Sequence, residues 1–227
     1  MVMTSVDDTS TAVSNGCHVN FISWNVKGLN HPVKRNKVLS HLLYLKVHVA
    51  FLQETHLKNT DHARLRQNWV GQIFHSKFNG KARGAAILIN KNTPFIVSHT
   101  IADPNGRYVV VTGSLFNTSL ILANVYAPNW NDSTFFNDFL NSLPQINTHQ
   151  LILGGDMNTV MDPVLDRSSD KRLQLPKSSL VLQSYLQTYG AVDAWRFLYP
   201  STKQYSFFSA VHQMYSRIVY FFVDKKL

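Results

Sequence analysis

The chain has 227 residues, of which 44% are apolar, so it can bury the core of a single domain. With 22 Lys and Arg against 13 Asp and Glu, the net charge is +9, which favours DNA over a small phosphorylated metabolite. No stretch approaches the ~18 apolar residues of a transmembrane helix, and the single cysteine excludes an internal disulfide.

A polar leader comes first in the chain. Residues 1–17 are rich in Ser, Thr and Asp, and they lack the basic and apolar regions of a signal peptide. We therefore expect residues 1–17 to be disordered and residues 18–227 to form one domain. The absence of a secretory signal and of paired cysteines predicts an intracellular protein without a membrane partner.

Strands and helices alternate along the rest of the chain. Short apolar runs predict strands at 19–25, 47–52, 84–89, 108–113, 120–125, 151–153, 205–209 and 216–223. Helical periodicity and capping residues predict helices at 32–46, 61–69, 133–140 and 177–189, with a polar surface loop at 161–178. This mixed alternation is typical of two packed sheets with helices outside.

Four of the predicted strands end in polar residues. A Gly-Gly-Asp-Met-Asn segment follows one strand, and in an extended segment Asp156 and Asn158 would point to the same face. Its two glycines would allow a sharp turn and let a phosphate approach the backbone. The simpler alternative is a turn in which the two side chains satisfy local backbone groups. Asn25, Glu54 and Tyr126 end the other strands, and ligands bind at such ends in layered α/β folds.

The motifs at these strand ends resemble a known family. The series SWNVKGL, LQETHL, NVYAPN and GGDMN, continued by residues 193–218, closely resembles the endonuclease domain of LINE-type (non-LTR) retrotransposons. That domain belongs to the exonuclease–endonuclease–phosphatase superfamily, together with exonuclease III and apurinic endonucleases. The resemblance implies a DNase I-like α/β fold, a four-layer α/β/β/α sandwich of two mixed sheets, with the active site at one end between the sheets.

The resemblance implies a Mg²⁺ cofactor, with Mn²⁺ as an alternative. Magnesium prefers oxygen ligands and keeps several waters, so one or two carboxylates suffice. Glu54 is the expected metal ligand, and Asn25 is expected to supply a further oxygen to the metal or its water shell. The alternative for Glu54 is an ordinary surface residue that caps a helix.

The remaining expected site residues act on substrate. Asp156 would orient or activate the attacking water, and Asn158 would donate to the scissile phosphate. Tyr126 would hydrogen-bond the phosphate through its phenol, unless the ring only packs in the core. Asn129 and Ser206 match positions that line the family's substrate groove. None of the ten histidines is assigned a catalytic role.

Two departures from the family pattern predict weak activity or none. Val219 stands where the family has an aspartate after its Arg-Ile pair, and valine carries neither charge nor acceptor. Asp224, five residues on, would lie on the opposite strand face and cannot replace it. The family also closes with a Ser-Asp-His strand that this sequence does not reach. The fold is therefore expected to lack its last strand and to leave a neighbouring strand edge unpaired.

Three functions are compatible with these features. The first is a Mg²⁺-dependent DNA endonuclease of the retrotransposon type, acting as a monomer in the nucleus. The second is a non-catalytic, basic DNA-binding remnant of the same fold, which Val219 favours. The third is a phosphatase or phospholipase on a small or lipid substrate, which the positive charge disfavours.

Overall fold

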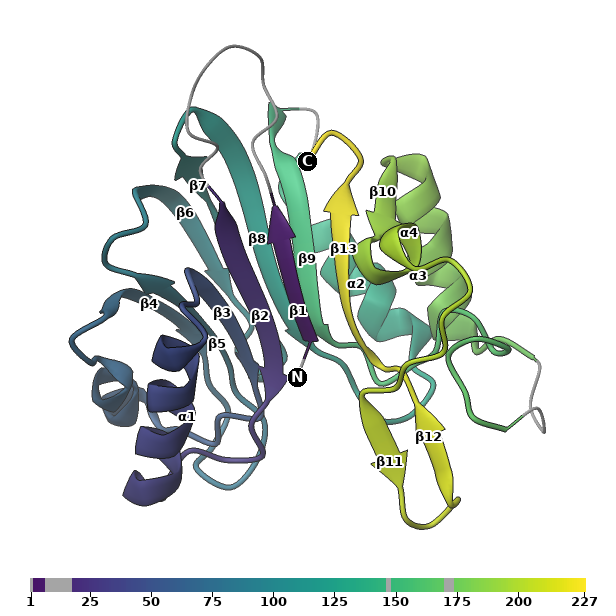
Figure 1. Ribbon diagram of the computed structural model, residues 1–227, viewed down its shortest axis with the longest axis horizontal. Coiled ribbons are helices and arrows are strands. Elements are labelled where there is room, and N and C mark those ends of the chain that lie inside the picture. The colour runs from purple at the N-terminus through teal and green to yellow at the C-terminus, as the bar shows by residue number, and fades with distance from the viewer. Residues whose placement is uncertain (1, 7–17, 146–147, 170–173) are drawn as a thin grey trace.

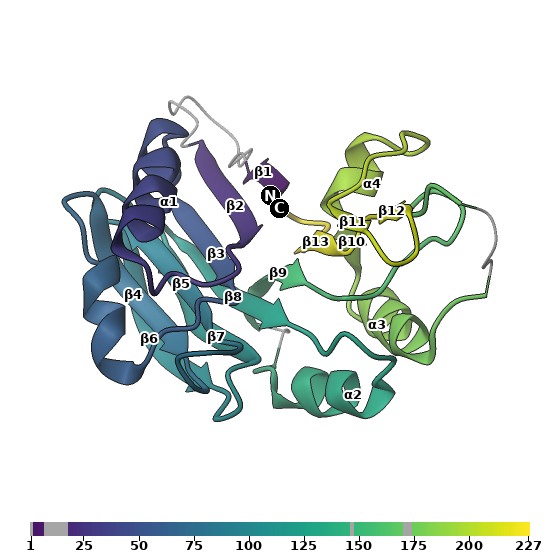
Figure 2. The ribbon, with the colours of Figure 1, turned by 90° about the horizontal axis from the view of Figure 1, so that it is seen from below.

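Two β-sheets pack face to face, with helices on their outer faces (Figure 1, Figure 2). The structure, a computed structural model, describes residues 2–6, 18–145, 148–169 and 174–227. Both sheets are mixed, because each contains one parallel pair among antiparallel ones, β2 with β3 and β8 with β9. Among the described residues, no helix is long and apolar enough to cross a bilayer.

The first sheet has the strand order β1-β2-β3-β5-β4. Its strands are β1 (Val2–Val6), β2 (Val19–Asn25), β3 (Val49–Gln53), β5 (Ala85–Asn90) and β4 (Val70–Ser76). The helix α1 (Pro32–Tyr44) connects β2 to β3 and covers the outer face of the sheet with Leu39 and Leu42. Proline at its first turn needs no hydrogen-bond donor there, so the helix begins where the sequence predicts.

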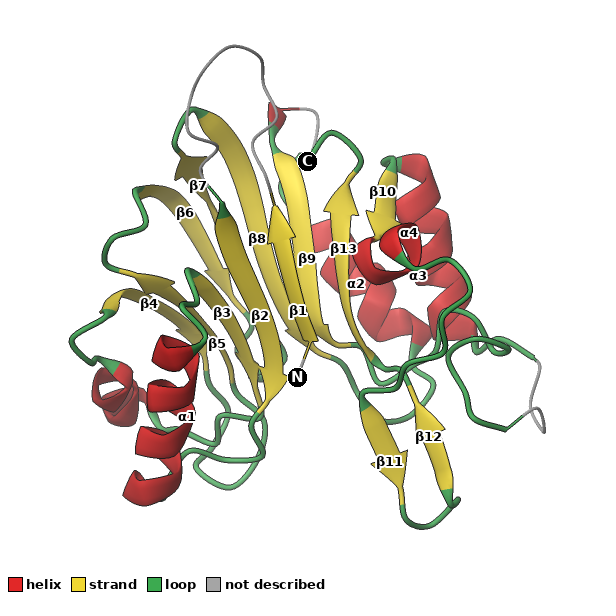
Figure 3. Ribbon diagram, in the orientation of Figure 1, coloured by secondary structure: helices red, strands yellow, loops and turns green. Residues whose placement is uncertain are grey.

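The second sheet has the strand order β10-β13-β9-β8-β7-β6. Its strands are β10 (Ala191–Asp193), β13 (Val219–Asp224), β9 (Gln150–Asp156), β8 (Thr118–Tyr126), β7 (Tyr108–Leu115) and β6 (Phe95–Ala102). Figure 3 shows the helices α2 (Ser133–Ser142) and α3 (Lys177–Thr188) beside this sheet, and a shared apolar cluster joins them to its outer face. The Asp132 side chain caps α2 by accepting from Phe135 N at 2.9 Å.

The core between the sheets is aromatic. Phe21 and Phe51 of the first sheet meet Phe221 of the second, with ring centroids of Phe51 and Phe221 5.6 Å apart. Each ring is at most 2% exposed, so this cluster contributes several kcal/mol of burial free energy. The close packing fixes how the strand ends of one sheet lie relative to those of the other.

Some elements differ from the sequence predictions. The expected helix at 61–69 is the 3-10 helix η1 (Asn59–Leu65), and the strands β4 and β6 were not expected. Most side chains of β6 are exposed, so this edge strand lacks the apolar pattern by which a strand is recognised. The expected strands at 205–209 and 216–223 are three: β11 (Phe207–Ser209), β12 (Met214–Ser216) and β13, with the short helix α4 (Ala194–Leu198) before them.

The expected disordered leader contains one strand. Within residues 1–17, β1 pairs antiparallel with residues 19–23 of β2, from Val2 opposite Ser23 to Val6 opposite Val19. The physical reason is that the edge of β2 offers a row of backbone donors and acceptors, which a Val- and Thr-containing segment can pair. Residues 1 and 7–17 lie outside the described residues.

Candidate functional site

The carboxyl ends of β2, β3, β8 and β9 meet at one end of the molecule, the lower end in Figure 1. Asn25 ends β2, and its Nδ2 donates to Glu54 Oε1 at 2.7 Å and to Asp156 Oδ2 at 2.9 Å. Glu54 follows β3 in the first sheet, whereas Asp156 ends β9 in the second. One amide group therefore joins two carboxylates across the two sheets.

The backbone around this centre adopts uncommon conformations. Positive φ angles occur at Lys27 (47°), Glu54 (53°), His56 (55°) and Asn158 (48°), none of which is glycine. A non-glycine residue in this region costs free energy and is found where surrounding contacts enforce it. Here the backbone of Glu54 is held because its carbonyl accepts from Gly28 N at 2.6 Å.

Asp156 is the most electrostatically perturbed carboxylate of the site. Its pKa is raised to about 6, chiefly by burial and also by the charge of Glu54, while hydrogen bonds from Asn25 and from the Asn158 backbone N–H oppose the rise. The side chain is 5% exposed. A carboxyl group with a pKa near neutrality can accept a proton at physiological pH, as a general base does.

Tyr126 ends β8 and faces the same centre. Tyr126 is the direct partner of Asp156 in the pairing of β8 with β9, and burial raises the pKa of its phenol well above the ordinary tyrosine value, with the charges of nearby Glu54 and Asp156 adding to the rise. The phenol therefore stays protonated and remains a donor at neutral pH. The Arg107 guanidinium lies 5.0 Å from the centre of its ring.

Asn158 makes the local contacts of a turn. Its backbone N–H donates to Asp156 Oδ1 at 3.1 Å, and its Nδ2 donates to Ala127 O at 2.8 Å. The extended backbone stops at Asp156, so the expected common face for the two side chains is wrong. The alternative of a turn, in which the two side chains bond to nearby backbone groups, agrees with these hydrogen bonds. Asp156 also accepts from Asn25 in the other sheet.

The two glycines before Asp156 allow neighbouring strands and rings to pack closely against β9. A Cβ on Gly154 would lie 2.6 Å from the Phe221 ring and 2.8 Å from the Phe51 ring, inside the core between the sheets. Gly155 has φ +138°, and a Cβ there would meet Val125 O at 2.0 Å. The sequence prediction that these glycines admit a phosphate is wrong, because protein atoms fill the space beside them.

A second polar bridge lies directly behind the site. Asn124 of β8 is fully buried, and its Nδ2 donates to the backbone carbonyls of Leu52 (2.9 Å) and Ala86 (2.8 Å) in the first sheet. Its Oδ1 accepts from Gln53 Nε2 at 2.7 Å. Three buried hydrogen bonds between the sheets fix the register in which Tyr126 and Glu54 meet. The feature of the sequence that could have indicated this buried contact is Asn124, a polar residue inside the apolar run 120–125.

Val219 occupies the other side of Asp156. The two residues are direct partners in the pairing of β13 with β9. Val219 is 4% exposed and packs with Val160 and Ile218 in a small apolar cluster. Asp224 pairs with Ala191 at the opposite end of β13, which confirms that it cannot replace a carboxylate at position 219.

The two expected substrate residues differ in their surroundings. Ser206 Oγ accepts from the backbone N–H groups of Ile218 (2.9 Å) and Val219 (3.1 Å), so its hydroxyl holds the start of β13. Asn129 is exposed in the loop after β8. The hairpin of β11 and β12 follows Ser206 and projects from the same end of the molecule (Figure 3).

A buried ionic network lies two residues before Val219. Arg217 donates to Asp166 Oδ1 at 2.8 Å and to Asp193 Oδ2 at 2.5 Å, and it is 4% exposed. The Tyr220 hydroxyl donates to Asp166 Oδ2 at 3.0 Å. These contacts anchor the loop before α3 and the start of α4 to β13. Nothing in the local sequence around Asp166 indicated this partner, because 51 residues separate it from Arg217.

The donors at the strand ends suit a hard divalent cation. Among the described residues, no three His, Cys, Asp or Glu side chains gather as a metal cluster. The oxygen donors are instead the partly exposed carboxylate of Glu54 and the buried carboxylate of Asp156, which both accept from Asn25 Nδ2, while Asn25 Oδ1 accepts from Lys27 N at 3.1 Å. Mg²⁺ is held by one or two carboxylates and several waters, so these oxygens fit it. His56 Nε2 lies 3.6 Å from Glu54 Oε2, a partner that the sequence analysis did not assign.

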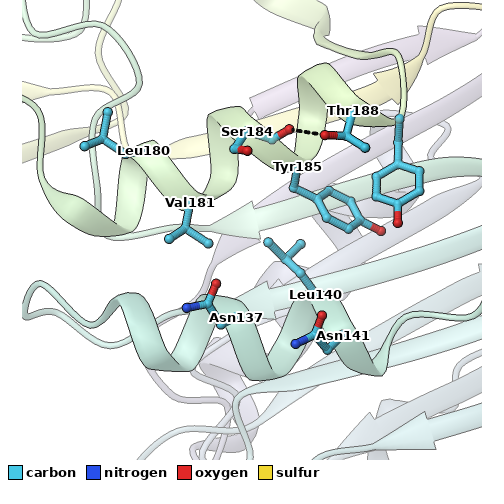
Figure 4. A pocket seen from close by; sticks show the side chains of 9 residues that line it. Asn137, Leu140, Asn141, Leu180, Val181, Ser184, Tyr185 and Thr188 are labelled. Atoms are coloured by element: carbon cyan, nitrogen blue, oxygen red, sulfur yellow. Dashed lines mark hydrogen bonds between the residues drawn. The ribbon is translucent and has the colours of Figure 1, made fainter.

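A cavity of about 450 Å³ lies elsewhere, between α2 and α3 on the outer face of the second sheet. Figure 4 shows that α2 contributes Asn137, Leu140 and Asn141 to it, facing Val181 and Tyr185 of α3. None of the strand-end residues lines this cavity. The strand-end site and this cavity are therefore separate features of the molecule.

Known proteins share the sequence pattern and the fold. A 149 kDa protein of transposon TX1 from Xenopus laevis is 29% identical over 187 residues, which are 81% of this chain but only 14% of that protein. The AP endonuclease of Leishmania major has a TM-score of 0.71 at 19% identity, covering 91% of this chain and 79% of its own. A 3′ phosphatase from Neisseria bound to a product DNA hairpin has a TM-score of 0.66 at 19% identity, covering 90% and 86%.

These likenesses confirm a DNase I-like α/β fold of two mixed sheets and a relationship to a LINE-type element. The match to a family is more extensive, since it spans residues 22–226 and contains all the strand ends described above. The chain therefore belongs to the Endonuclease/Exonuclease/phosphatase family.

Proposed function

We propose that this chain hydrolyses phosphodiester bonds of DNA with Mg²⁺, as a retrotransposon-type endonuclease, and that its turnover is low. The observation that carries the proposal is the Asn25 amide, which joins Glu54 and Asp156 across the two sheets. A buried carboxylate held beside a second one is a costly arrangement that a catalytic site explains. The positive net charge supports DNA as the substrate.

Glu54 and Asn25 are the residues that would hold Mg²⁺, or Mn²⁺ in its place. When bound, the cation would supply positive charge to the phosphoryl oxygens. Both residues lie at strand ends whose backbones are fixed by the sheet, so the Glu54 carboxylate is preorganised, and Asn25 Oδ1, which accepts from Lys27 N, would bind the metal with its second lone pair.

The other polar groups would act on water and phosphate. Asp156, with its pKa raised to about 6, would accept a proton from the attacking water at its carboxylate. Tyr126 would donate its hydroxyl hydrogen bond to a phosphate oxygen, because it stays protonated. Asn158 and the exposed Asn129 would contact the substrate from the loops that follow β9 and β8. Ser206 would act indirectly, by holding β13.

Val219 supports the low turnover. It places a hydrocarbon side chain directly opposite Asp156, where a carboxylate would accept hydrogen bonds from an active-site amide. The Asn158 amide instead donates to Ala127 O. A polar group missing from a preorganised site commonly costs on the order of 100-fold in rate.

Relaxation of supercoiled plasmid tests the proposal. The purified chain should nick plasmid slowly with Mg²⁺ and lose this activity with EDTA and in Glu54→Gln. The matched control is Asp138→Asn, which removes one negative charge from the exposed surface of α2 and should nick like the wild type. Equal nicking by wild type and Glu54→Gln would assign the activity to a contaminant and reject the proposal.

Val219 also favours a second candidate, a DNA-binding protein without catalytic activity. In that case the chain would bind DNA with an affinity that falls steeply as salt rises, and no plasmid would be nicked at any protein concentration. Titration of one labelled duplex with and without Mg²⁺, read by both binding and nicking, separates the two candidates.

A further inference from the structure

An exposed tryptophan lies beside the candidate site without an assigned role. Trp130 is 58% exposed, in the loop that follows the site strand β8. Large aromatic side chains are usually buried, because each removes a large apolar area from water. An exposed indole four residues after Tyr126 therefore needs an explanation in its surroundings.

Arg107 connects Trp130 to the site. Its guanidinium lies 5.7 Å from the Trp130 ring and 5.0 Å from the Tyr126 ring, and its Nη1 donates to Ala127 O at 3.3 Å. Tyr126 in turn is the direct partner of Asp156 in the pairing of β8 with β9, and the charge of Glu54 helps to raise the pKa of its phenol. Arg107 is only 8% exposed, and both rings lie within the range of a cation–π contact with its guanidinium. A continuous series of contacts thus runs from the candidate site to the exposed indole.

A second cation lies close to this series. The charge of Arg83 acts against that of Arg107, so the two guanidinium groups are near neighbours. Arg83 itself lies 4.2 Å from the ring of Phe78, which is 45% exposed. The charge of Asp103 offsets part of this repulsion on Arg107, and a phosphate of a nucleic-acid strand would supply a further anion near both guanidinium groups.

We propose that Trp130 stacks on an unpaired nucleobase next to the phosphate that the site binds, with Arg107 and Arg83 holding the adjoining backbone. This inference rests on the proposed function and names the form of DNA that the site takes. A base within a duplex has its faces covered by its neighbours, so an aromatic ring can stack only on an unpaired or extruded base. The preferred substrate is therefore a strand with an unpaired base beside the bond to be cut.

The alternative is that Trp130 only covers Arg107. Leucine at this position would keep an apolar cover over the guanidinium but would have no aromatic face, whereas phenylalanine would keep both. The two variants Trp130→Leu and Trp130→Phe therefore separate stacking on a base from covering of the arginine. Tyr44→Leu is the matched control, since Tyr44 is 80% exposed at the end of α1.

The test measures binding of two labelled single strands of equal length in EDTA, so that neither is cut. One is a thymidine strand, and the other carries tetrahydrofuran units in place of the bases. Trp130→Leu should weaken binding of the thymidine strand about tenfold, which is about 1.4 kcal/mol, and leave the base-free strand unaffected. Trp130→Phe and Tyr44→Leu should bind both strands as the wild type does.

Tryptophan emission gives an independent measurement. The thymidine strand should quench the wild-type emission and should quench Trp130→Phe much less, although both proteins bind it equally well. Equal loss of affinity for both strands in Trp130→Leu, or no loss for either, would overturn the stacking role while leaving the proposed function intact. A wild-type protein that binds neither strand would also overturn the stacking role, whereas the proposed function is decided separately by plasmid nicking.

Discussion

The two sides of Asp156 are built from opposite kinds of residue. On one side, Asn25 and Glu54 are polar, hydrogen-bonded across the sheets and held by strained backbone. On the other side, Val219 and its neighbours Val160 and Ile218 form an apolar cluster on the second sheet. The same carboxylate therefore has a preorganised polar environment in one direction and hydrocarbon in the other.

The difference shows how locally a site can change. Two residues before Val219, Arg217 keeps its bonds to Asp166 and Asp193, and Ser206 still accepts from the backbone at residue 219. The hydrogen bonds of Arg217 and Ser206 around position 219 are thus in place, although the side chain that faces Asp156 has no polar group. Catalytic chemistry and structural support are separable here because different side chains of the same strand provide them.

The largest expected effect comes from removing the Arg217 ionic network on the apolar side of Asp156. Arg217→Met would leave the buried Asp166 with only Arg196 as a cation and would remove the partner of the half-buried Asp193, which should lower the free energy of unfolding by about 3 kcal/mol. Urea unfolding followed by circular dichroism measures it. Arg64→Met is the control, since its pair with Asp61 is largely exposed and should contribute under about 1 kcal/mol. Equal effects of the two substitutions would contradict a structural role for the Arg217 network.

The second expected effect concerns the polar side. The pKa of Asp156 is raised from 3.8 to about 6, so the unfolded chain releases its proton at lower pH than the folded chain. Stability from this group is present below pH 3.8 and is lost as pH rises through about 6, by up to about 3 kcal/mol. In EDTA, Asp156→Asn should therefore be more stable than the wild type at neutral pH, with the difference shrinking toward pH 4 in thermal unfolding curves. A difference that does not change with pH would contradict the raised pKa.

The third expected effect comes from a substitution that would make both sides of Asp156 polar. Val219→Asp places a carboxylate opposite Asp156, where it can accept from the Asn158 amide, and should raise plasmid nicking with Mg²⁺ about tenfold. The added negative charge would also raise the pKa of Asp156, so the gain should be larger at higher pH.

Two further variants control for shape and charge at position 219. Val219→Asn can accept a hydrogen bond but carries no charge, so it should recover less activity than Val219→Asp. Val219→Leu keeps the position apolar and should nick no faster than the wild type. A folded Val219→Asp protein without any gain would mean that residue 219 does not limit the reaction.

The polar side of the site was largely predictable from the sequence. Apolar runs ending at Asn25, Glu54, Tyr126 and Asp156 identified four strand ends, and the sheet pairing brings those ends together. Such a signal is local, because a buried strand and the residue after it are neighbours in the chain. The helices α1, α2 and α3 were predictable for the same reason, from their periodicity and caps.

The supporting contacts were not predictable, because they join distant segments. Arg217 and Asp166 are 51 residues apart, and Gln53 and Asn124 are 71 apart, with no local pattern to pair them. Gly154 was misinterpreted for a related reason: its close neighbours are the Phe51 and Phe221 rings, which come from other strands. Exposed edge elements such as β6 gave no apolar pattern at all.

The smallest expected effect separates support from substrate contact at Ser206. Its Oγ accepts two backbone N–H groups at the start of β13, so Ser206→Ala should lower the free energy of unfolding by about 1–2 kcal/mol. If Ser206 acts only through β13, nicking per folded molecule should change little, and KM for DNA should stay constant. Ser206→Thr keeps the hydroxyl and should restore stability. A raised KM in Ser206→Ala with unchanged stability would instead place this residue in the substrate groove, and the apolar side of Asp156 would then contain a functional group after all.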